Sequence, residues 1–496
     1  MSQSSPLAST DLESAAPARA SWHIVGMLVA YSFMTWFNRV SMSVAYDEQI
    51  KAESGIAPED MGFVYSSFLF FYMLCMTPGG WLIDKYGPWK ALVVMGLGSA
   101  LFGMLTGTAG LPAIVAAGLL LPALLVIRSL MGILTAPVYP ACSRVVAHWV
   151  PLTQRARANG FIQGAAGVGI ACAFPVFGTM LDWMHWHIAF LVTGIVTAVV
   201  AITWMAFGAN DPRKQLVSES RRQRRYDDSE VASPPSTDAA VTGITAGPPP
   251  QPAVLGDTGI TAERPRVPAI QRISHDGSWW TLLGNRSLML LTLSYAAVGY
   301  VEYLFYFWMH YYFEDVLKFG KNESRFYAAI MTLSMAVGMV LGGWIADRLR
   351  STYGGKGVAL VPALGLCAGG ALLLLGVLAQ DTVWIVTWLA LALGAVGATE
   401  APVWTMAIEL GKRYGGTAAA ICNTGGNAGG LLAPIVTPFL SAWIIRHYDV
   451  SEQASWQWAI SLGSLIAVLG AVLWFWITPE DSGHQLVPEG NAAPEG

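Results

Sequence analysis

The sequence predicts an all-α integral membrane protein, with twelve transmembrane helices in two pseudo-symmetric six-helix bundles. Three observations lead to this fold class. Of the 496 residues, 54% are hydrophobic and only 12% are charged, whereas about 25% are charged in an average soluble domain. The apolar residues fall in runs of about 18–25 residues, the length that a helix needs to cross a bilayer. In addition, the second half of the chain repeats motifs of the first half.

The apolar runs define the expected helices and what lies between them. The runs cover residues 22–46, 61–83, 90–110, 113–141, 157–181 and 186–208, and then 286–313, 324–346, 357–379, 383–408, 416–445 and 456–477. This division gives an N-terminal tail (1–21), an N-terminal bundle (22–208), a linker (209–285), a C-terminal bundle (286–477) and a C-terminal tail (478–496). The linker is polar and rich in Pro, Ser and Gly, so we expect it to be disordered.

Basic residues concentrate in the loops that follow even-numbered helices. These residues are Lys85, Lys90, Arg155, Arg157, Arg221, Arg222, Arg224, Arg225, Arg348, Arg350, Lys412 and Arg413. Short loops rich in Lys and Arg stay in the cytoplasm. We therefore expect a multi-pass protein of the plasma (cytoplasmic) membrane, with both termini in the cytoplasm.

Two motifs recur at nearly the same spacing. The segment from Gly79 to Lys85 returns 263 residues later as Gly342 to Arg348. The Thr-Ala-Pro-Val-Tyr segment at Thr135 returns 265 residues later as Glu-Ala-Pro-Val-Trp at Glu400. Two independent matches favour a duplicated six-helix unit.

The first motif, Gly-Trp-Leu-Ile-Asp-Lys-Tyr-Gly after the second helix, resembles the loop motif of the major facilitator superfamily. Finer features are similar to the anion:cation symporter branch, which includes hexuronate, galactonate and glucarate transporters: Asn38 to Ala45, Ala136 to Pro140, and the glycine-rich segment after Asn423. The resemblance implies a secondary transporter that works by alternating access. It also implies gating residues at Gly80, Asp84, Gly87 and Lys90, with Asp347 and Arg348 in a degenerate second copy.

Two buried arginines predict an anionic substrate. Arg39 and Arg128 lie inside expected helices, where an ionised group is costly and usually functional. A guanidinium offers paired donors that suit a carboxylate or phosphate; the alternative is that each arginine only pairs with a nearby acid. Polar groups that could bind a sugar acid are Tyr72, Gln163, Tyr303, Tyr306 and Asn423.

The ion-coupling acids are expected in the second half. The symporter branch usually has carboxylates at the positions of Asn38 and Thr135, and these acids are thought to bind the driving proton. In the repeat, Glu400 is at the position equivalent to Thr135, and Glu302 is close to the position equivalent to Asn38. Glu302 and Glu400 are therefore the predicted coupling residues, and a static role in salt bridges is the alternative.

The expected function is transport of a small organic anion, such as a sugar acid, by proton-coupled symport, with sodium as another possible coupling ion. No catalytic, metal-binding or cofactor-binding motif occurs, so we expect no enzyme activity, no cofactor and no nucleic-acid partner. The protein is expected to act as a monomer. Facilitated diffusion of a neutral or zwitterionic solute and a solute sensor are the alternatives; deletion of 225–265 would abolish signalling only in a sensor. The helix glycines Gly160, Gly164, Gly167 and Gly169 are expected to permit tight helix contacts.

Overall fold

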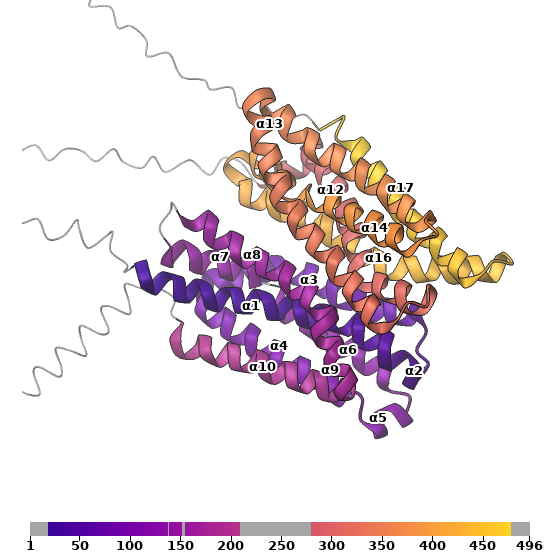
Figure 1. Cartoon of the computed structure of the whole chain (residues 1–496). Helices are drawn as coiled ribbons and strands as arrows, with labels where there is room; N and C mark the ends of the chain where they lie inside the picture. Colours follow the sequence, from indigo (N-terminus) through magenta and orange to yellow (C-terminus); the bar gives the residue numbers. More distant parts are fainter. Residues whose placement is uncertain (1–17, 137, 151–153, 209–278, 478–496) are drawn as a thin grey trace, which may run out of the picture. The chain divides into compact units, whose positions relative to one another are not determined.

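The computed structural model describes residues 18–136, 138–150, 154–208 and 279–477, and none of these residues lies in a β-strand (Figure 1). The first half contains α1 (Ala18–Ala45), η2 (Tyr46–Ile50), α2 (Lys51–Ser54), α3 (Pro58–Tyr86), α4 (Pro88–Thr108), α5 (Pro112–Ala116), α6 (Leu120–Thr135), α7 (Val138–Trp149), α8 (Arg155–Cys172), η4 (Ala173–Phe177), α9 (Gly178–Trp183) and α10 (Trp186–Phe207). The second half contains η5 (Trp279–Gly284), α12 (Arg286–Tyr311), η6 (Tyr312–Val316), α13 (Lys321–Leu378), α14 (Thr382–Gly397), α15 (Glu400–Gly411), η7 (Lys412–Tyr414), α16 (Gly415–His447) and α17 (Glu452–Leu473).

Several helix boundaries follow local sequence signals. Pro88 opens α4, where its missing N–H would have no partner in any case. The junction before it needs Gly87, whose φ of 87° is strained for any other residue. Side-chain oxygens cap three later helices: Asn285 caps α12, Asp381 caps α14 and Ser451 caps α17. Such caps bind backbone N–H groups that the helix itself leaves without a partner.

The expected fourth helix, 113–141, differs from the structure. It is divided into the short α5, the longer α6 and the separate α7. A left-handed turn at Gly118, with φ of 69°, separates α5 from α6. The hydropathy pattern did not reveal this turn because the residues around it are apolar.

Most of the polar segments lie outside the described residues. The N-terminal tail is described only from residue 18, the linker only from 279, and nothing after 477 is described. At the end of the linker, Trp279–Gly284 forms a 3-10 helix where disorder was predicted.

Within the described residues, nine helical segments are long and apolar enough to cross a membrane. One of them, α13, consists of two helices that meet at Gly354, where φ is 63° and ψ is −146°. The helices α1 and α3, of 28 and 29 residues, are also long enough to span a bilayer. The all-α membrane fold class is thus confirmed, while the crossing of the membrane by α1 and α3 stays a prediction.

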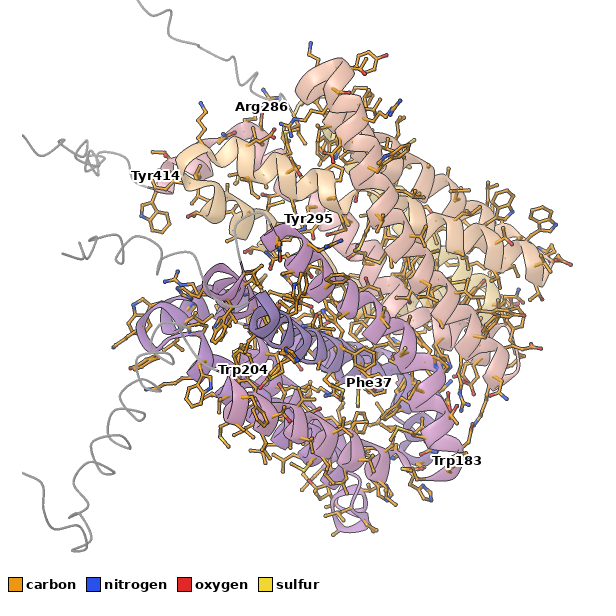
Figure 2. The ribbon with its side chains drawn as sticks, turned by 60° about the vertical axis from the view of Figure 1, so that its left-hand side comes forward. Phe37, Trp183, Trp204, Arg286, Tyr295 and Tyr414 are labelled. Atoms are coloured by element: carbon orange, nitrogen blue, oxygen red, sulfur yellow. The ribbon has the colours of Figure 1, made fainter. Side chains whose placement is uncertain are left out.

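Close helix contacts repeat between the halves. A Cβ atom at Gly169 of α8 would lie 2.5 Å from the carbonyl oxygen of Phe33 on α1. In the second half, a Cβ atom at Gly429 of α16 would lie 1.8 Å from the carbonyl oxygen of Ala296 on α12. Small residues allow such backbone contacts in membrane proteins. Side chains, including Phe37 of α1, fill the space between helices (Figure 2).

The repeated Ala-Pro-Val motif lies near a helix boundary in both halves. In the first half α6 ends at Thr135, and in the second half α15 begins at Glu400 after a break at Ala398 and Thr399. The two halves also contact each other, with α3 packed against α16, α8 against α13 and α1 against α12. These contacts place residues of α1, α8, α12 and α13 around a common space.

Candidate functional site

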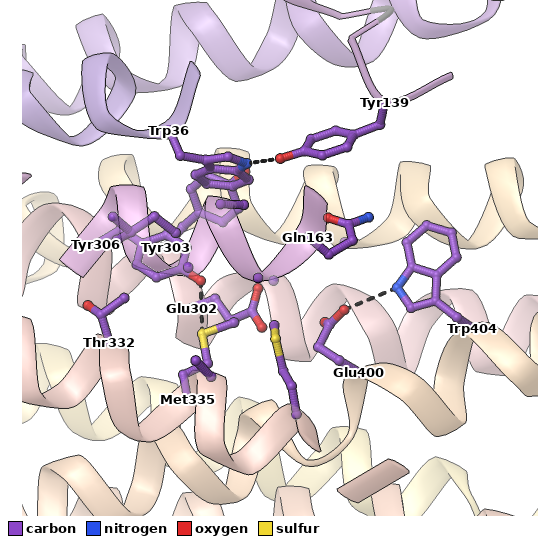
Figure 3. Close-up of a pocket in the computed structure, with 18 of the residues that line it drawn as sticks. Trp36, Tyr139, Gln163, Glu302, Tyr303, Tyr306, Thr332, Met335, Glu400 and Trp404 are labelled. Atoms are coloured by element: carbon purple, nitrogen blue, oxygen red, sulfur yellow. Dashed lines mark hydrogen bonds between the residues drawn. The ribbon is translucent and has the colours of Figure 1, made fainter. Parts of the chain in front are cut away.

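A cavity of about 450 Å³ lies between the two halves (Figure 3). Its volume falls within the range of about 300–1,000 Å³ that is usual for small-molecule sites. The polar groups and aromatic rings on its wall include Trp36, Arg39, Tyr72, Tyr139, Gln163, Tyr295, Glu302, Tyr303, Tyr306, Thr332, Glu400, Trp404, Asn423 and Asn427. On α8 the wall runs from Ile170 to Gly160, close to the helix start. The cavity therefore extends toward the end of the protein that the sequence predicts to be cytoplasmic.

Arg39 supplies a buried positive charge to this cavity. Its guanidinium lies 4.1 Å from the centroid of Trp36, 4.5 Å from Phe68 and 4.8 Å from Tyr72. Its Nη1 donates a hydrogen bond to the hydroxyl of Tyr303, at 2.9 Å.

The remaining donors of Arg39 have no protein acceptor. Within the described ranges, Nε and Nη2 make no hydrogen bond, and the ion pairs involve other basic residues. Arg39 therefore forms no ion pair in the described part of the structure, which argues against the alternative that it only pairs with a nearby acid. Since arginine stays ionised and its burial is costly, the free donors favour an anionic ligand.

Glu302 of α12 and Glu400 of α15 both line the cavity and lie near each other (Figure 3). Their carboxyl groups lie close enough to interact electrostatically. Glu400 accepts hydrogen bonds from the hydroxyl of Tyr295 and from Nε1 of Trp404, both at 3.1 Å. Neither acid pairs with a basic residue of the described chain. The alternative that both acids form static salt bridges is therefore not supported by the described part of the structure.

All the hydrogen-bonding residues predicted from the sequence line the cavity: Tyr72, Gln163, Tyr303, Tyr306 and Asn423. The hydroxyl of Tyr306 is already engaged, because it donates to the sulfur of Met335 at 2.9 Å. The side-chain amide of Asn427 donates to the backbone oxygen of Asn423 at 2.9 Å and to its side-chain oxygen at 3.3 Å. Gln163 is exposed to the cavity and is available to a ligand.

Arg128 does not line the cavity. It is as buried as Arg39, each residue being 3% exposed. Its Nη1 donates to the backbone carbonyl of Asn38 at 3.3 Å, and its guanidinium lies 5.5 Å from the centroid of Phe190. The expected pair of guanidiniums facing one cavity is therefore not formed in this structure.

Sequence reasoning missed several residues of the wall. Trp36 and Tyr139 form a hydrogen-bonded aromatic pair from α1 and α7 (Figure 3). Trp404 and Tyr295 hold Glu400. The repeat could have indicated Trp404, because Trp404 is equivalent to Tyr139 at the offset of 265. Nothing in the sequence distinguishes Trp36 from the other tryptophans.

The α8 glycines have two different roles. Gly169 permits close contact with α1, as expected, but a Cβ atom at Gly160 or Gly164 would meet no atom within 4 Å. Both of these residues line the cavity. The packing prediction was therefore wrong for Gly160 and Gly164, which keep the cavity wide.

The predicted gating residues lie at the end of α3 and in α13. Gly87 forms the turn before α4, while Lys90 of α4 and both Asp347 and Arg348 of α13 are exposed. The side chain of Asp84 lies outside the described part of the structure. Near the second copy of the motif, Arg350 of α13 pairs with Glu409 of α15, an ion pair that the sequence did not indicate.

A membrane-embedded cavity between two repeat-related bundles is the architecture of a secondary transporter. The sequence profile of the Major Facilitator Superfamily matches residues 28–434, and the chain belongs to this superfamily. Its members and the relatives below are transporters, which confirms the expectation that the chain is not an enzyme.

Several curated relatives align over most of the chain. A probable sulfoacetate transporter of Cupriavidus necator is 24% identical, over 92% of this chain and 93% of the relative. A probable galactarate/D-glucarate transporter of Bacillus subtilis is 24% identical, over 86% of each chain. A D-galactonate transporter of Escherichia coli is 26% identical, over 87% of this chain and 91% of the relative. These similarities agree with the resemblance to organic-anion transporters seen in the sequence.

Solved structures share the fold. A bacterial homologue of the human lysosomal transporter Spinster, in an inward-facing and unoccupied conformation, superposes with a TM-score of 0.69 at 15% identity, over 93% of this chain and 97% of that chain. A D-xylose-proton symporter superposes with a TM-score of 0.64 at 15% identity, over 93% and 98%.

Proposed function

We propose that this protein is a secondary transporter for a small organic anion, which binds through a carboxylate or sulfonate to Arg39. The observation that carries this proposal is the buried guanidinium of Arg39, a residue of the cavity wall, because two of its donors have no protein acceptor. An acid group with two acceptor oxygens can accept from both donors at once. The names of the relatives support this substrate class, because sulfoacetate, galactarate, glucarate and galactonate are all small organic anions.

We further propose that Glu302 and Glu400 bind the coupling proton. Two carboxylates close together and shielded from water repel each other, and one proton relieves that repulsion. The positions that carry acids in similar transporters are neutral here and have local partners: Asn38 donates to Thr197 at 2.8 Å, and Thr135 donates to the Met131 carbonyl at 2.9 Å. Their neutrality supports a transfer of the coupling role to the second half.

Orientation, location and assembly are part of the same proposal. The basic loops favour a plasma-membrane protein with both termini in the cytoplasm. With both bundles supplied by one chain, the cavity wall is complete without a second copy, which supports a monomer as the functional unit.

Uptake into proteoliposomes tests the proposal. The panel contains sugar acids, sulfoacetate and matched neutral sugars, each measured with and without an inwardly directed proton gradient. We expect uptake of one or more anions, accumulation only with the gradient, and no uptake of the neutral sugars. Uptake of neutral sugars alone would rule out an anion transporter.

Glu400→Gln tests the coupling role. Glutamine keeps a carbonyl oxygen for Tyr295 and Trp404 but cannot be ionised. We expect the variant to retain substrate binding and counterflow exchange while losing accumulation driven by the proton gradient, and Glu302→Gln to behave alike. Gradient-driven accumulation by both variants would show that these acids are not the coupling site.

A zwitterionic substrate is the second candidate, because the same cavity is lined by a cation and by two carboxylates. In that case Glu400 would contact an ammonium group of the substrate. Glu400→Gln would then weaken binding itself, which distinguishes this candidate from proton coupling.

A further inference from the structure

A cluster of buried charged side chains joins the two halves at the end opposite the start of α1. The first half contributes Asp47 and Glu48 from η2, directly after α1. The second half contributes His310 at the end of α12 and Glu314 from η6. Both η2 and η6 are π-helical turns, and they lie 266 residues apart, close to the offset of the repeat. Such turns often occur at functional sites.

His310 is held in the orientation of a metal ligand. Its Nδ1 lies 2.9 Å from a carboxylate oxygen of Asp47, and both side chains are fully buried. Its Nε2 makes no hydrogen bond with any described residue. A carboxylate that fixes one nitrogen of a histidine while the other nitrogen binds a metal is a common arrangement in metal sites.

Two carboxylate oxygens lie in front of this free nitrogen. Nε2 of His310 is 3.5 Å from Oε1 of Glu48 and 3.7 Å from Oε2 of Glu314, and the three atoms lie within 4.8 Å of one another. These separations are too long for hydrogen bonds. Two ligand atoms bound at about 2.1 Å to one tetrahedral ion stand about 3.4 Å apart, which is close to the two nitrogen–oxygen separations.

The cluster also carries excess negative charge. Five carboxylates belong to it or contact it: Asp47, Glu48, Asp182, Glu314 and Asp315. Three cations act on them: Arg325, Lys51 and the exposed Lys321. Arg325 pairs with Glu48 and Asp182 at 2.6 Å, and Lys51 pairs with Asp315 at 3.1 Å. A divalent cation would reduce the remaining negative charge, which is costly away from water.

We propose that His310, Glu48 and Glu314 bind a divalent transition metal ion, with Zn²⁺ as the best fit, and that Asp47 positions the histidine. Histidine nitrogen and carboxylate oxygen are both Zn²⁺ ligands, and three protein ligands would leave the fourth tetrahedral position open to water. The ligands come from both halves, so the ion ties the halves together at this end. Alternating access requires the halves to separate there; bound metal therefore slows transport.

Binding of Zn²⁺ to the purified full-length protein tests the proposal directly and does not depend on what the cavity carries. The reference protein carries His185→Ala, because exposed His185 stacks on His187 and lies 3.5 Å from Glu53, a possible surface site. Calorimetry after chelator treatment should find one site per chain. Co²⁺ should give the visible absorption of a four-coordinate ion.

Three variants test two of the ligands and the residue that positions the histidine. We expect His310→Asn and Glu314→Gln each to weaken Zn²⁺ binding at least tenfold, and Asp47→Asn to weaken it about tenfold through the histidine. The circular dichroism of each variant checks folding, and the partly exposed Glu314 is the safest position to change.

Transport supplies an independent readout. Zn²⁺ should inhibit counterflow by the reference protein, the chelator should reverse the inhibition, and folded Glu314→Gln should resist it. Absence of Zn²⁺ binding to the reference protein, or equal binding by folded Glu314→Gln, would overturn the proposal and leave the cluster as an ion-pair network alone.

Discussion

Replacing Arg39 by lysine keeps the positive charge of the cavity but removes the planar pair of donors. Nε and Nη2 of Arg39 are buried and have no acceptor among the described residues. An acid group that accepts from both makes two charge-assisted hydrogen bonds, each worth about 1.5–3 kcal/mol. A lysine ammonium, held on a flexible chain, replaces only one of them. Since about 1.4 kcal/mol corresponds to a tenfold change in affinity, we expect binding to weaken about 10- to 150-fold.

The assay is the affinity of the purified protein for the anion that the uptake panel identifies, measured by calorimetry in detergent, together with uptake into proteoliposomes. Arg128→Lys is the matched control, because Arg128 is equally buried but lies outside the cavity wall. We expect Arg128→Lys to lower the melting temperature while leaving the affinity for the anion nearly unchanged. If Arg39→Lys binds within threefold of the wild type, or if both variants lose affinity equally, then the bidentate role of Arg39 is refuted.

The remaining predictions concern helix packing, gating and the end of the protein where the cluster of buried charges joins the two halves. Gly164→Ala should fold normally, whereas Gly169→Ala should lose about 1–3 kcal/mol of stability by overpacking against Phe33, as comparison of their melting temperatures will show. Asp84→Asn should lower turnover while affinity in detergent stays within a few-fold; loss of binding by folded protein would contradict a gating role. Arg325→Gln leaves buried Glu48 without its partner and should increase opening of that end, measured by spin-label distances.

Much of the fold follows from the sequence. An apolar run of membrane-spanning length has few alternatives to a helix, because the bilayer offers no partners to exposed backbone groups. For this reason the expected helix at 186–208 agrees closely with the observed helix α10, Trp186–Phe207. The two repeated motifs also predicted the duplicated halves before any contact between them was known. Turns within apolar sequence, such as the one at Gly118, were not predictable from hydropathy.

The candidate site was predictable in its chemistry but not in its assembly. Burial cost singled out Arg39 and Arg128 alike, since both are arginines within apolar runs. Only the packing of α1 and α6 decided that Arg39 faces the cavity while Arg128 lies against the Asn38 carbonyl. Gly164 and Gly169 likewise look equivalent in the sequence, because both are glycines within one apolar helix, and only the packing separates their roles.

The sequence by itself determined the helices, their duplication and the presence of rare charges among apolar residues, because these depend on local composition and on the thickness of the bilayer. The tertiary structure decided which charges meet. His310 follows Asp47 and Glu48 by more than 260 residues, and no spacing rule reveals such a group. Its assembly depends on the packing of two bundles, which brings η2 against the end of α12 and leaves the nitrogen of His310 facing two carboxylates.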